Sequence, residues 1–255
     1  MQRFEQLPTT VSATSAAARI SMSALDTAIA RIPGLVHDMD VSRLADAASA
    51  GRCRGSGAKV AKVGAGVSRV ASSYLNGKAA WRMATEGGSK VRIASAWPGA
   101  DADFTLVFAG TLGAGTSGST PTRNIVTIGS GTGAFAVLWQ VTGGAMRFRL
   151  GTSGGLNTTS MPVANTPCIM AVQRKGAVLS LDINGIIVAT ATDTDILPDL
   201  AVQPIHLGSS MPVTTDPTFD GDCARFLAYS AAILTDTPAA WAELVAEARD
   251  EFGIA

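Results

Sequence analysis

Two stretches of alternating hydrophobic and polar residues predict β-hairpins. In the first, residues 134–141 and 145–150 flank Gly143-Gly144, a signal for a two-residue turn. With that turn, Trp139 pairs with Phe148. Because side chains alternate across a strand, one face becomes apolar and the other polar. The residues predicted on the apolar core face are Val137, Trp139, Val141, Met146, Phe148 and Leu150. The residues predicted on the polar face are Gln140, Arg147 and Arg149.

In the second hairpin, residues 178–183 and 186–190 flank Asn184-Gly185, a strong signal for a tight turn. The residues predicted on its apolar face are Leu179, Leu181, Ile183, Ile186 and Val188. Further short apolar runs predict strands at 79–84, 90–94, 104–110, 125–128, 168–173, 204–208 and 226–229. Each sheet built from such strands has one apolar face to bury, so we expect two facing antiparallel sheets.

A single amphipathic helix is predicted at the end of the chain, over residues 237–252. Thr235-Asp236-Thr237-Pro238 has the residues of a helix start, and Gly253 is a typical helix stop. The apolar stripe of this helix needs a sheet to cover, and we expect the helix at an edge or across one end of the sandwich. The stripe consists of Trp241, Leu244, Val245, Ala248 and Phe252.

Residues 1–32 differ in composition from the rest, being rich in Ala, Ser and Thr. Ser23 and Asp26 form a weak capping pair, which predicts a short helix over residues 22–31. We interpret 1–32 as an arm that docks on a partner through Leu25, Ile29 and Ile32; the alternative is a frayed leader. The segment lacks the apolar run of a secretory signal. Residues 33–255 are then the β domain.

Three segments together resemble a known fold family. They are Phe219-Asp220-Gly221-Asp222 before the last strand and helix, Pro33-Gly34-Leu35-Val36-His37-Asp38-Met39-Asp40, and Leu75-Asn76-Gly77-Lys78-Ala79-Ala80-Trp81-Arg82-Met83. Taken in their order along the chain, they resemble the concanavalin A-like (laminin-G-like) jelly-roll domains. The resemblance implies a jelly-roll sandwich over about residues 33–255. Two departures are Asp38, where the family often has Trp, and Arg225, where it often has Glu.

Composition narrows the range of functions. Lys+Arg and Asp+Glu are both 20, so the net charge is zero, which argues against nucleic acid as a partner. Charged residues make up only 16% of the chain, which favours burial of surface in a homo-oligomer, with a trimer as a first guess. Cys53, Cys168 and Cys223 show no zinc spacing, and three separate thiols are expected.

The residues that catalysis would need are scarce. The Glu residues are Glu5, Glu86, Glu243, Glu247 and Glu251. They provide no pair on one strand of the kind that the β-glucanases of this fold use. His37 and His206 are expected to be hydrogen-bonded strand residues. The basic run at 51–66 is expected to be a solvated loop, and the alternative is a binding site for a phosphate or an acidic glycan. No cofactor is expected, although Asp216, Asp220 and Asp222 leave calcium open.

The sequence therefore predicts a non-enzymatic jelly-roll. The leader and composition resemble accessory structural proteins of tailed bacteriophages, such as head fibres, decoration proteins and tail fibres. This resemblance implies assembly in the host cytoplasm, a place on the virion surface and contact with host glycan. The glycan site is predicted at Gln140, Arg147 and Arg149, between loops 113–122 and 151–160. The alternatives are a secreted glycan-binding module, a divergent glycoside hydrolase, or packing of this face on a neighbouring subunit.

Overall fold

The structure of the protein is a computed structural model that describes most of the chain. It covers residues 22–83, 89–94, 103–113, 122–129, 136–141, 145–150, 155–193, 204–208 and 220–255, with only the backbone of 122–123 and 136–141. The helices are α1 (Ala24–Arg31), the 3₁₀ turn η1 (Val41–Arg43), α2 (Ile233–Asp236) and α3 (Pro238–Phe252).

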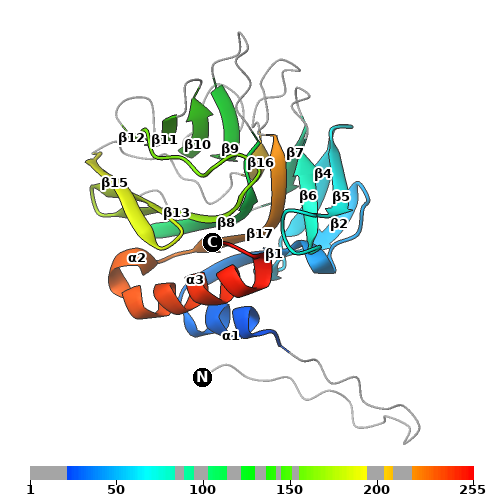
Figure 1. Cartoon of the computed structure of the whole chain (residues 1–255), viewed down its shortest axis with the longest axis horizontal. Helices are drawn as coiled ribbons and strands as arrows, with labels where there is room; N and C mark the ends of the chain where they lie inside the picture. The colour runs from blue at the N-terminus through cyan, green and yellow to red at the C-terminus, as the bar shows by residue number, and fades with distance from the viewer. Residues whose placement is uncertain are drawn as a thin grey trace, which may run out of the picture.

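Two antiparallel sheets form a sandwich (Figure 1). Sheet A has nine strands, ordered β15-β14-β13-β8-β17-β1-β3, with β6 also pairing with β17 and β5 with β6. Sheet B has eight, ordered β12-β11-β10-β9-β16-β7-β4-β2. The strands of sheet A are β1 (Leu35–Asp40), β3 (Arg54–Gly55), β5 (Val67–Ala71), β6 (Ala79–Met83), β8 (Phe104–Thr111), β13 (Pro167–Lys175), β14 (Val178–Ile183), β15 (Ile186–Thr192) and β17 (Gly221–Tyr229). The strands of sheet B are β2 (Ser49–Arg52), β4 (Lys59–Val63), β7 (Lys90–Ile93), β9 (Thr122–Ile128), β10 (Ala136–Val141), β11 (Ala145–Leu150), β12 (Leu156–Thr158) and β16 (Ile205–Gly208). The predicted jelly-roll sandwich is confirmed.

Apolar side chains from the inner faces of both sheets fill the space between them. Phe104 of sheet A meets Phe148 of sheet B edge to face, with ring centroids 6.3 Å apart. Burying a side chain of this size stabilises the fold by about 1.5–3 kcal/mol. A slip of one residue in any strand would move such side chains to the outer face, so the core fixes the register of the strands around it.

Helix α3 covers the outer face of sheet A (Figure 1). Its predicted stripe is buried as expected, against Val107, Ala109 and Leu227 of the sheet among others. The helix begins at Pro238 and ends at Phe252, and the next residue, Gly253, has a φ of 71°, the left-handed conformation typical of a helix C-cap. The prediction that the helix would lie at an edge or end was wrong, because β8, β13 and β17 present apolar residues on both faces and the outer one also needs cover.

Helix α1 also packs on this face and corrects the predicted docking arm. The helix forms where expected, and the Ser23 side chain accepts a hydrogen bond from the Asp26 backbone N–H, as the capping pair predicted. However, Leu25, Ile29 and Ile32 are at most 2% exposed and lie in the same apolar cluster as α3. These residues cannot dock on a partner while they fill the core of their own chain. Residues 22–32 therefore belong to the domain, and residues 1–21 lie outside the described part.

The hairpin of β14 and β15 forms around Asn184-Gly185 as predicted. Both residues have positive φ, 55° and 84°, which the tight turn requires. A bulge opposite Leu181 and Asp182 shifts the register along β15. Ile186, predicted on the core face, is instead 65% exposed, because it sits at the tip of the hairpin beyond the reach of sheet B.

Candidate functional site

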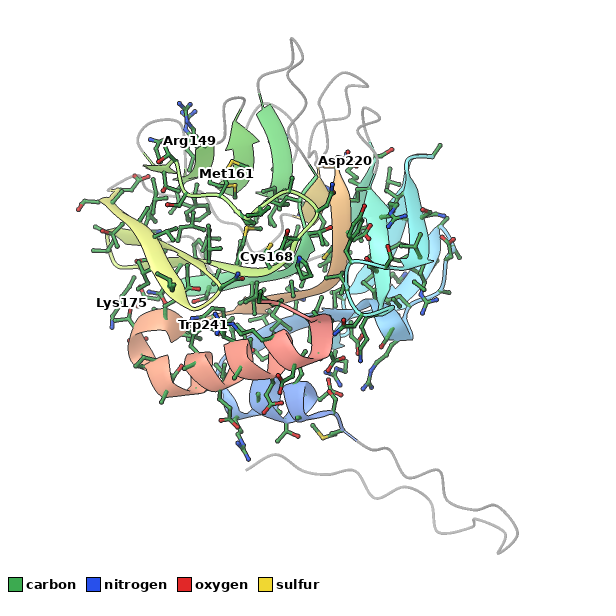
Figure 2. All side chains as sticks on the ribbon, in the orientation of Figure 1. Arg149, Met161, Cys168, Lys175, Asp220 and Trp241 are labelled. Atoms are coloured by element: carbon green, nitrogen blue, oxygen red, sulfur yellow. The ribbon has the colours of Figure 1, made fainter. Side chains whose placement is uncertain are left out.

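Helices α1 and α3 pack on the outer face of sheet A, whereas none of the described helices packs on that of sheet B. On β7, Val91 and Ile93 are buried and Arg92 between them is exposed. On β11, Met146, Phe148 and Leu150 are buried, whereas Arg147 is exposed and Arg149 is half-buried. Figure 2 shows Arg149 pointing away from sheet A, on the side of the molecule opposite Trp241 of α3. Strand alternation thus points these arginines outward from the core.

One row of residues crosses this face perpendicular to the strands. The backbone register pairs Arg92 of β7 with His206 of β16, His206 with Thr127 of β9, Thr127 with Val137 of β10, and Val137 with Arg149 of β11. With strands about 4.8 Å apart, the two arginines lie about 19 Å apart at the Cα atoms. His206 and Thr127 are 3% and 1% exposed and form the floor between them.

A second row lies beside the first, toward the β12 edge. It runs from Asn124 of β9 through Trp139 of β10 and Arg147 of β11 to Asn157 of β12. Asn157 and Arg147 are exposed and Asn124 is half-buried. The amides can donate and accept hydrogen bonds, and the guanidinium offers five N–H donors in a planar fork. Apart from Val137 and Trp139 of β10, the residues of both rows are polar.

Two buried polar atoms in the first row have no hydrogen-bond partner within the described structure. They are Nδ1 of His206 and Nε of Arg149. A buried polar atom without a partner costs about 1–3 kcal/mol, so both atoms are unusual in a folded protein. Burial, together with the charges of Lys90 and Arg92, lowers the pKa of His206 to about 4. The ring is therefore neutral near pH 7, and one of its nitrogens is engaged in a hydrogen bond with the backbone of Gly129.

The structure brings together two of the three residues predicted for the glycan site. Arg147 and Arg149 share the outer face, but Gln140 pairs with the buried Met146 rather than with Arg147. The predicted pairing of Trp139 with Phe148 was also wrong by one residue, since Trp139 pairs with Arg147. The side chains of Gln140 and Trp139, the turn at 143–144 and the loops at 114–121 and 151–154 lie outside the described residues.

Sequence reasoning missed the other members of the face: Arg92, Asn124, Thr127, Asn157 and His206. A signal for them was present, because Lys-Val-Arg-Ile at 90–93 alternates charge and hydrophobicity in the same way as Met-Arg-Phe-Arg-Leu at 146–150. What the sequence does not give is the strand order that places β7 and β11 in one sheet.

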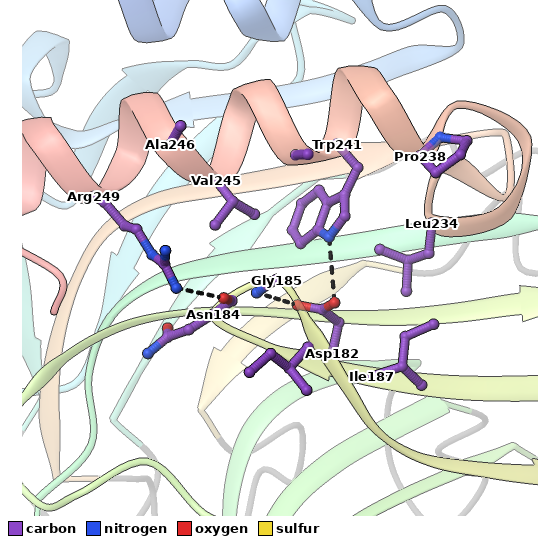
Figure 3. A pocket seen from close by; sticks show the side chains of 12 residues that line it. Asp182, Asn184, Gly185, Ile187, Leu234, Pro238, Trp241, Val245, Ala246 and Arg249 are labelled. Atoms are coloured by element: carbon purple, nitrogen blue, oxygen red, sulfur yellow. Dashed lines mark hydrogen bonds between the residues drawn. The ribbon is translucent and has the colours of Figure 1, made fainter.

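A groove of about 570 Å³ lies between α3 and the β14–β15 hairpin (Figure 3). The carboxylate of Asp182, 1% exposed, accepts hydrogen bonds from Trp241 Nε1 at 3.3 Å and from the Gly185 N–H at 2.8 Å. Burial raises the pKa of Asp182 above its ordinary value. Arg249 donates to the Asn184 carbonyl at 2.9 Å. These bonds hold the hairpin against α3, so the polar groups of the groove serve the fold.

A buried cluster of charges ties α1 to sheet A. Arg225 of β17 donates to Asp38 at 2.8 Å and to Asp26 of α1 at 2.7 Å, and Arg54 donates to the same two carboxylates. Burial alone would raise the pKa of Asp26, but Arg54 and Arg225 hold it well below its usual range. The two arginines thus keep the Asp26 carboxylate ionised, and the cluster stabilises the packing of α1 on sheet A.

The other candidate residues have structural partners. His37 Nδ1 lies 2.7 Å from Ser56 Oγ, which confirms a hydrogen-bonded strand residue. Asp222, one of the three predicted calcium ligands, accepts hydrogen bonds from Ser72 and Arg82, and Asp216 lies outside the described residues. The three free cysteines, which confirm the predicted separate thiols, are all buried: Cys53, Cys168 and Cys223. Among the described residues, no group of three or more His, Cys, Asp or Glu side chains could hold a metal ion.

This architecture is an antiparallel β-sandwich with helices packed on one outer face. No family model and no curated protein sequence matches the chain. Solved structures with a similar fold include Trypanosoma rangeli sialidase in complex with sialic acid, at a TM-score of 0.63 and 14% identity over 85% of this chain and 33% of that one. The ligand binding domain of botulinum neurotoxin serotype D in complex with N-acetylneuraminic acid has a TM-score of 0.64 and 13% identity over 86% of this chain and 52% of that one.

The binding domain of botulinum neurotoxin serotype C1 is similar too, with a TM-score of 0.60 and 11% identity over 84% of this chain and 52% of that one. This chain thus spans a third to a half of the lengths of these structures. At such identities the likeness shows the fold alone. Within the described residues, no helix has both the length and the apolar character needed to cross a membrane.

Proposed function

We propose that this protein is a non-enzymatic glycan-binding domain whose binding surface is the outer face of sheet B. The observation that carries the proposal is the pair of polar rows on that face, from Arg92 to Arg149 and from Asn124 to Asn157. Arginine, asparagine and neutral histidine side chains match the hydroxyl and ring substituents of sugars with directional hydrogen bonds. Both kinds of similar fold named above occur in complexes with a sugar acid, which supports the proposal.

The proposed absence of catalysis rests on the composition of this face. Most glycoside hydrolases use a pair of carboxylates that flank the scissile bond. The strands of sheet B, within their described bounds, contain neither Asp nor Glu. Buried Asp38, Asp182 and Asp222 of sheet A are engaged by arginine, tryptophan or backbone donors. A divergent hydrolase is therefore the weaker reading of this fold.

Virion attachment stays a prediction from the sequence. It was assigned to residues 1–32, and α1 within that range belongs to the domain, so attachment would depend on residues 1–21. The secreted-module alternative shares the proposed glycan site and differs only in location.

A glycan array with the purified chain tests the proposed function. We expect binding to a subset of glycans, and a loss of at least about tenfold in affinity for the double variant R147A/N157A, since both side chains are exposed on the proposed surface. The variant K78A is the control, because Lys78 lies at the surface near α3, where it pairs with Glu251. Silence across the array, or equal binding by R147A/N157A and K78A, would contradict the proposal.

A further inference from the structure

Basic residues are concentrated in sheet B and acidic residues are excluded from it. Its eight strands carry no Asp or Glu within their bounds, although the chain has 20 Asp+Glu. The basic residues of these strands are Arg52, Lys59, Lys62, Lys90, Arg92, Arg123, Arg147 and Arg149, with His206 among them. Although the chain has no net charge, the charged residues in the strands of sheet B are therefore all basic.

Sheet A handles its charges differently. There, arginines and aspartates occur together and pair, as Arg225 does with Asp38 and Arg82 does with Asp222. In sheet B, Lys62 pairs with Asp46 from outside the strands. By contrast, Arg92, Arg147 and Arg149 form no ion pair with any residue in the described part of the chain. Unpaired like charges on one surface repel, and they raise the local potential that attracts an anion.

The spacing of these arginines suits an extended ligand. Arg147 and Arg149 are two residues apart on β11, about 7 Å along the strand, whereas Arg92 lies about 19 Å away across four strand spacings. A single sugar cannot reach both positions at once. A chain with repeated negative charges that crosses the strands from β7 to β11 can contact all three arginines.

The uncharged polar groups near the arginines favour a glycan over a nucleic acid. Asn124, Asn157 and the neutral ring of His206 are uncharged donors and acceptors suited to hydroxyl groups. Single-stranded nucleic acids are bound by aromatic side chains on which bases stack. Among the described side chains of this face the only ring is that of His206, which is 3% exposed; because the backbone of Trp139 stands in the second row, the test below includes single-stranded DNA.

We propose, resting on the proposed function, that the ligand is an extended anionic polysaccharide bound across sheet B by Arg92, Arg147 and Arg149. Guanidinium forks bind carboxylate and sulfate groups with two parallel hydrogen bonds each, so the shared chemistry is the repeated oxyanion. Nothing in the spacing alone separates a carboxylated from a sulfated chain, and the experiment below contains an arm for each.

The test compares four polymers by biolayer interferometry on the full chain: hyaluronan, dextran sulfate, neutral dextran and single-stranded DNA. We expect hyaluronan or dextran sulfate to bind at least about tenfold more tightly than dextran and DNA, and the binding to weaken about tenfold or more between 50 and 200 mM NaCl. The variant R92S/R147S/R149S should lose about 100-fold or more.

The matched control removes the same charge from the opposite side of the molecule. The variant R31S/K78S/K175S breaks exposed ion pairs with Glu243, Glu251 and Asp236, which contribute little to stability, and it should bind like the wild type. Equal loss in both triple variants would overturn the proposal by showing that only net charge matters.

The remaining outcomes separate this inference from the function on which it rests. Equal binding of dextran and the anionic polymers would overturn the anionic specificity and leave glycan binding standing. Tighter binding of single-stranded DNA would overturn the polysaccharide as ligand. If neither these polymers nor any glycan of the array bound, both the inference and the proposed function would fail.

Discussion

Replacing Arg225 with methionine is expected to lower the free energy of unfolding by about 3–5 kcal/mol. Arg225 is 4% exposed and bridges Asp38 and Asp26, which are 1% and 4% exposed. Although burial opposes its charge, the hydrogen bonds and charge of Asp38 raise the pKa of Arg225 above its ordinary value. Methionine keeps much of the volume but leaves Asp38 with Arg54 alone, and Asp26 with Arg54 and Arg43.

Urea denaturation of R225M beside R54M measures this effect. Arg54 contacts the same carboxylates, but its side chain is 32% exposed, so water can replace part of its contribution and the loss should be smaller. The double variant R225M/D38N should recover part of the loss, because it also removes one of the two buried negative charges that Arg225 neutralised. A loss below about 1 kcal/mol for R225M would show that the cluster does not hold α1 to the sheet.

Acidification is expected to remove up to about 3 kcal/mol of stability through His206 alone. Its pKa is about 4 in the folded protein against 6.5 for the unperturbed group. Because the folded-state pKa is the lower one, this contribution is fully present above pH 6.5 and is lost as the pH falls toward 4. Burial comes first among its causes, followed by the neighbouring charges of Lys90 and Arg92.

The variant H206Q isolates that contribution from other titrating groups. His37 also has a lowered pKa through burial, so the wild type and H206Q both keep the part due to His37. The free energy of unfolding of the wild type minus that of H206Q should decrease as the pH is lowered from 6.5 to 4. A difference that stays constant over this range would show that His206 is not held neutral by its surroundings.

Local patterns in the sequence were enough to predict α3 and the β14–β15 hairpin. A helical stripe ending in Gly253 and a turn built on Asn184-Gly185 both depend on neighbours within a few residues. The first hairpin was harder, because Gly143-Gly144 can close the strands in more than one register. Strand pairing there begins with Val141 opposite Ala145, which leaves three residues between the strands rather than two.

Contacts between distant parts of the chain were the ones that sequence patterns could not give. The stripe of Leu25, Ile29 and Ile32 shows that α1 needs an apolar neighbour, but not that this neighbour is α3, more than 200 residues later. The same holds for the outer face of sheet B. Arg147 and Arg149 were found from one hairpin, whereas Arg92 and His206 join them only through the strand order β11-β10-β9-β16-β7.

The most direct measurement of the central claim is an NMR titration of the isotope-labelled chain with a hyaluronan hexasaccharide. The central claim is that the outer face of sheet B holds the ligand. This claim predicts that the ligand shifts the Nε–H signals of Arg92, Arg147 and Arg149 and the backbone amide signals of β7 and β11. The amide signals of α3 should stay unchanged. Shifts confined to α3 and the β14–β15 groove, with the sheet B arginines unmoved, would contradict it.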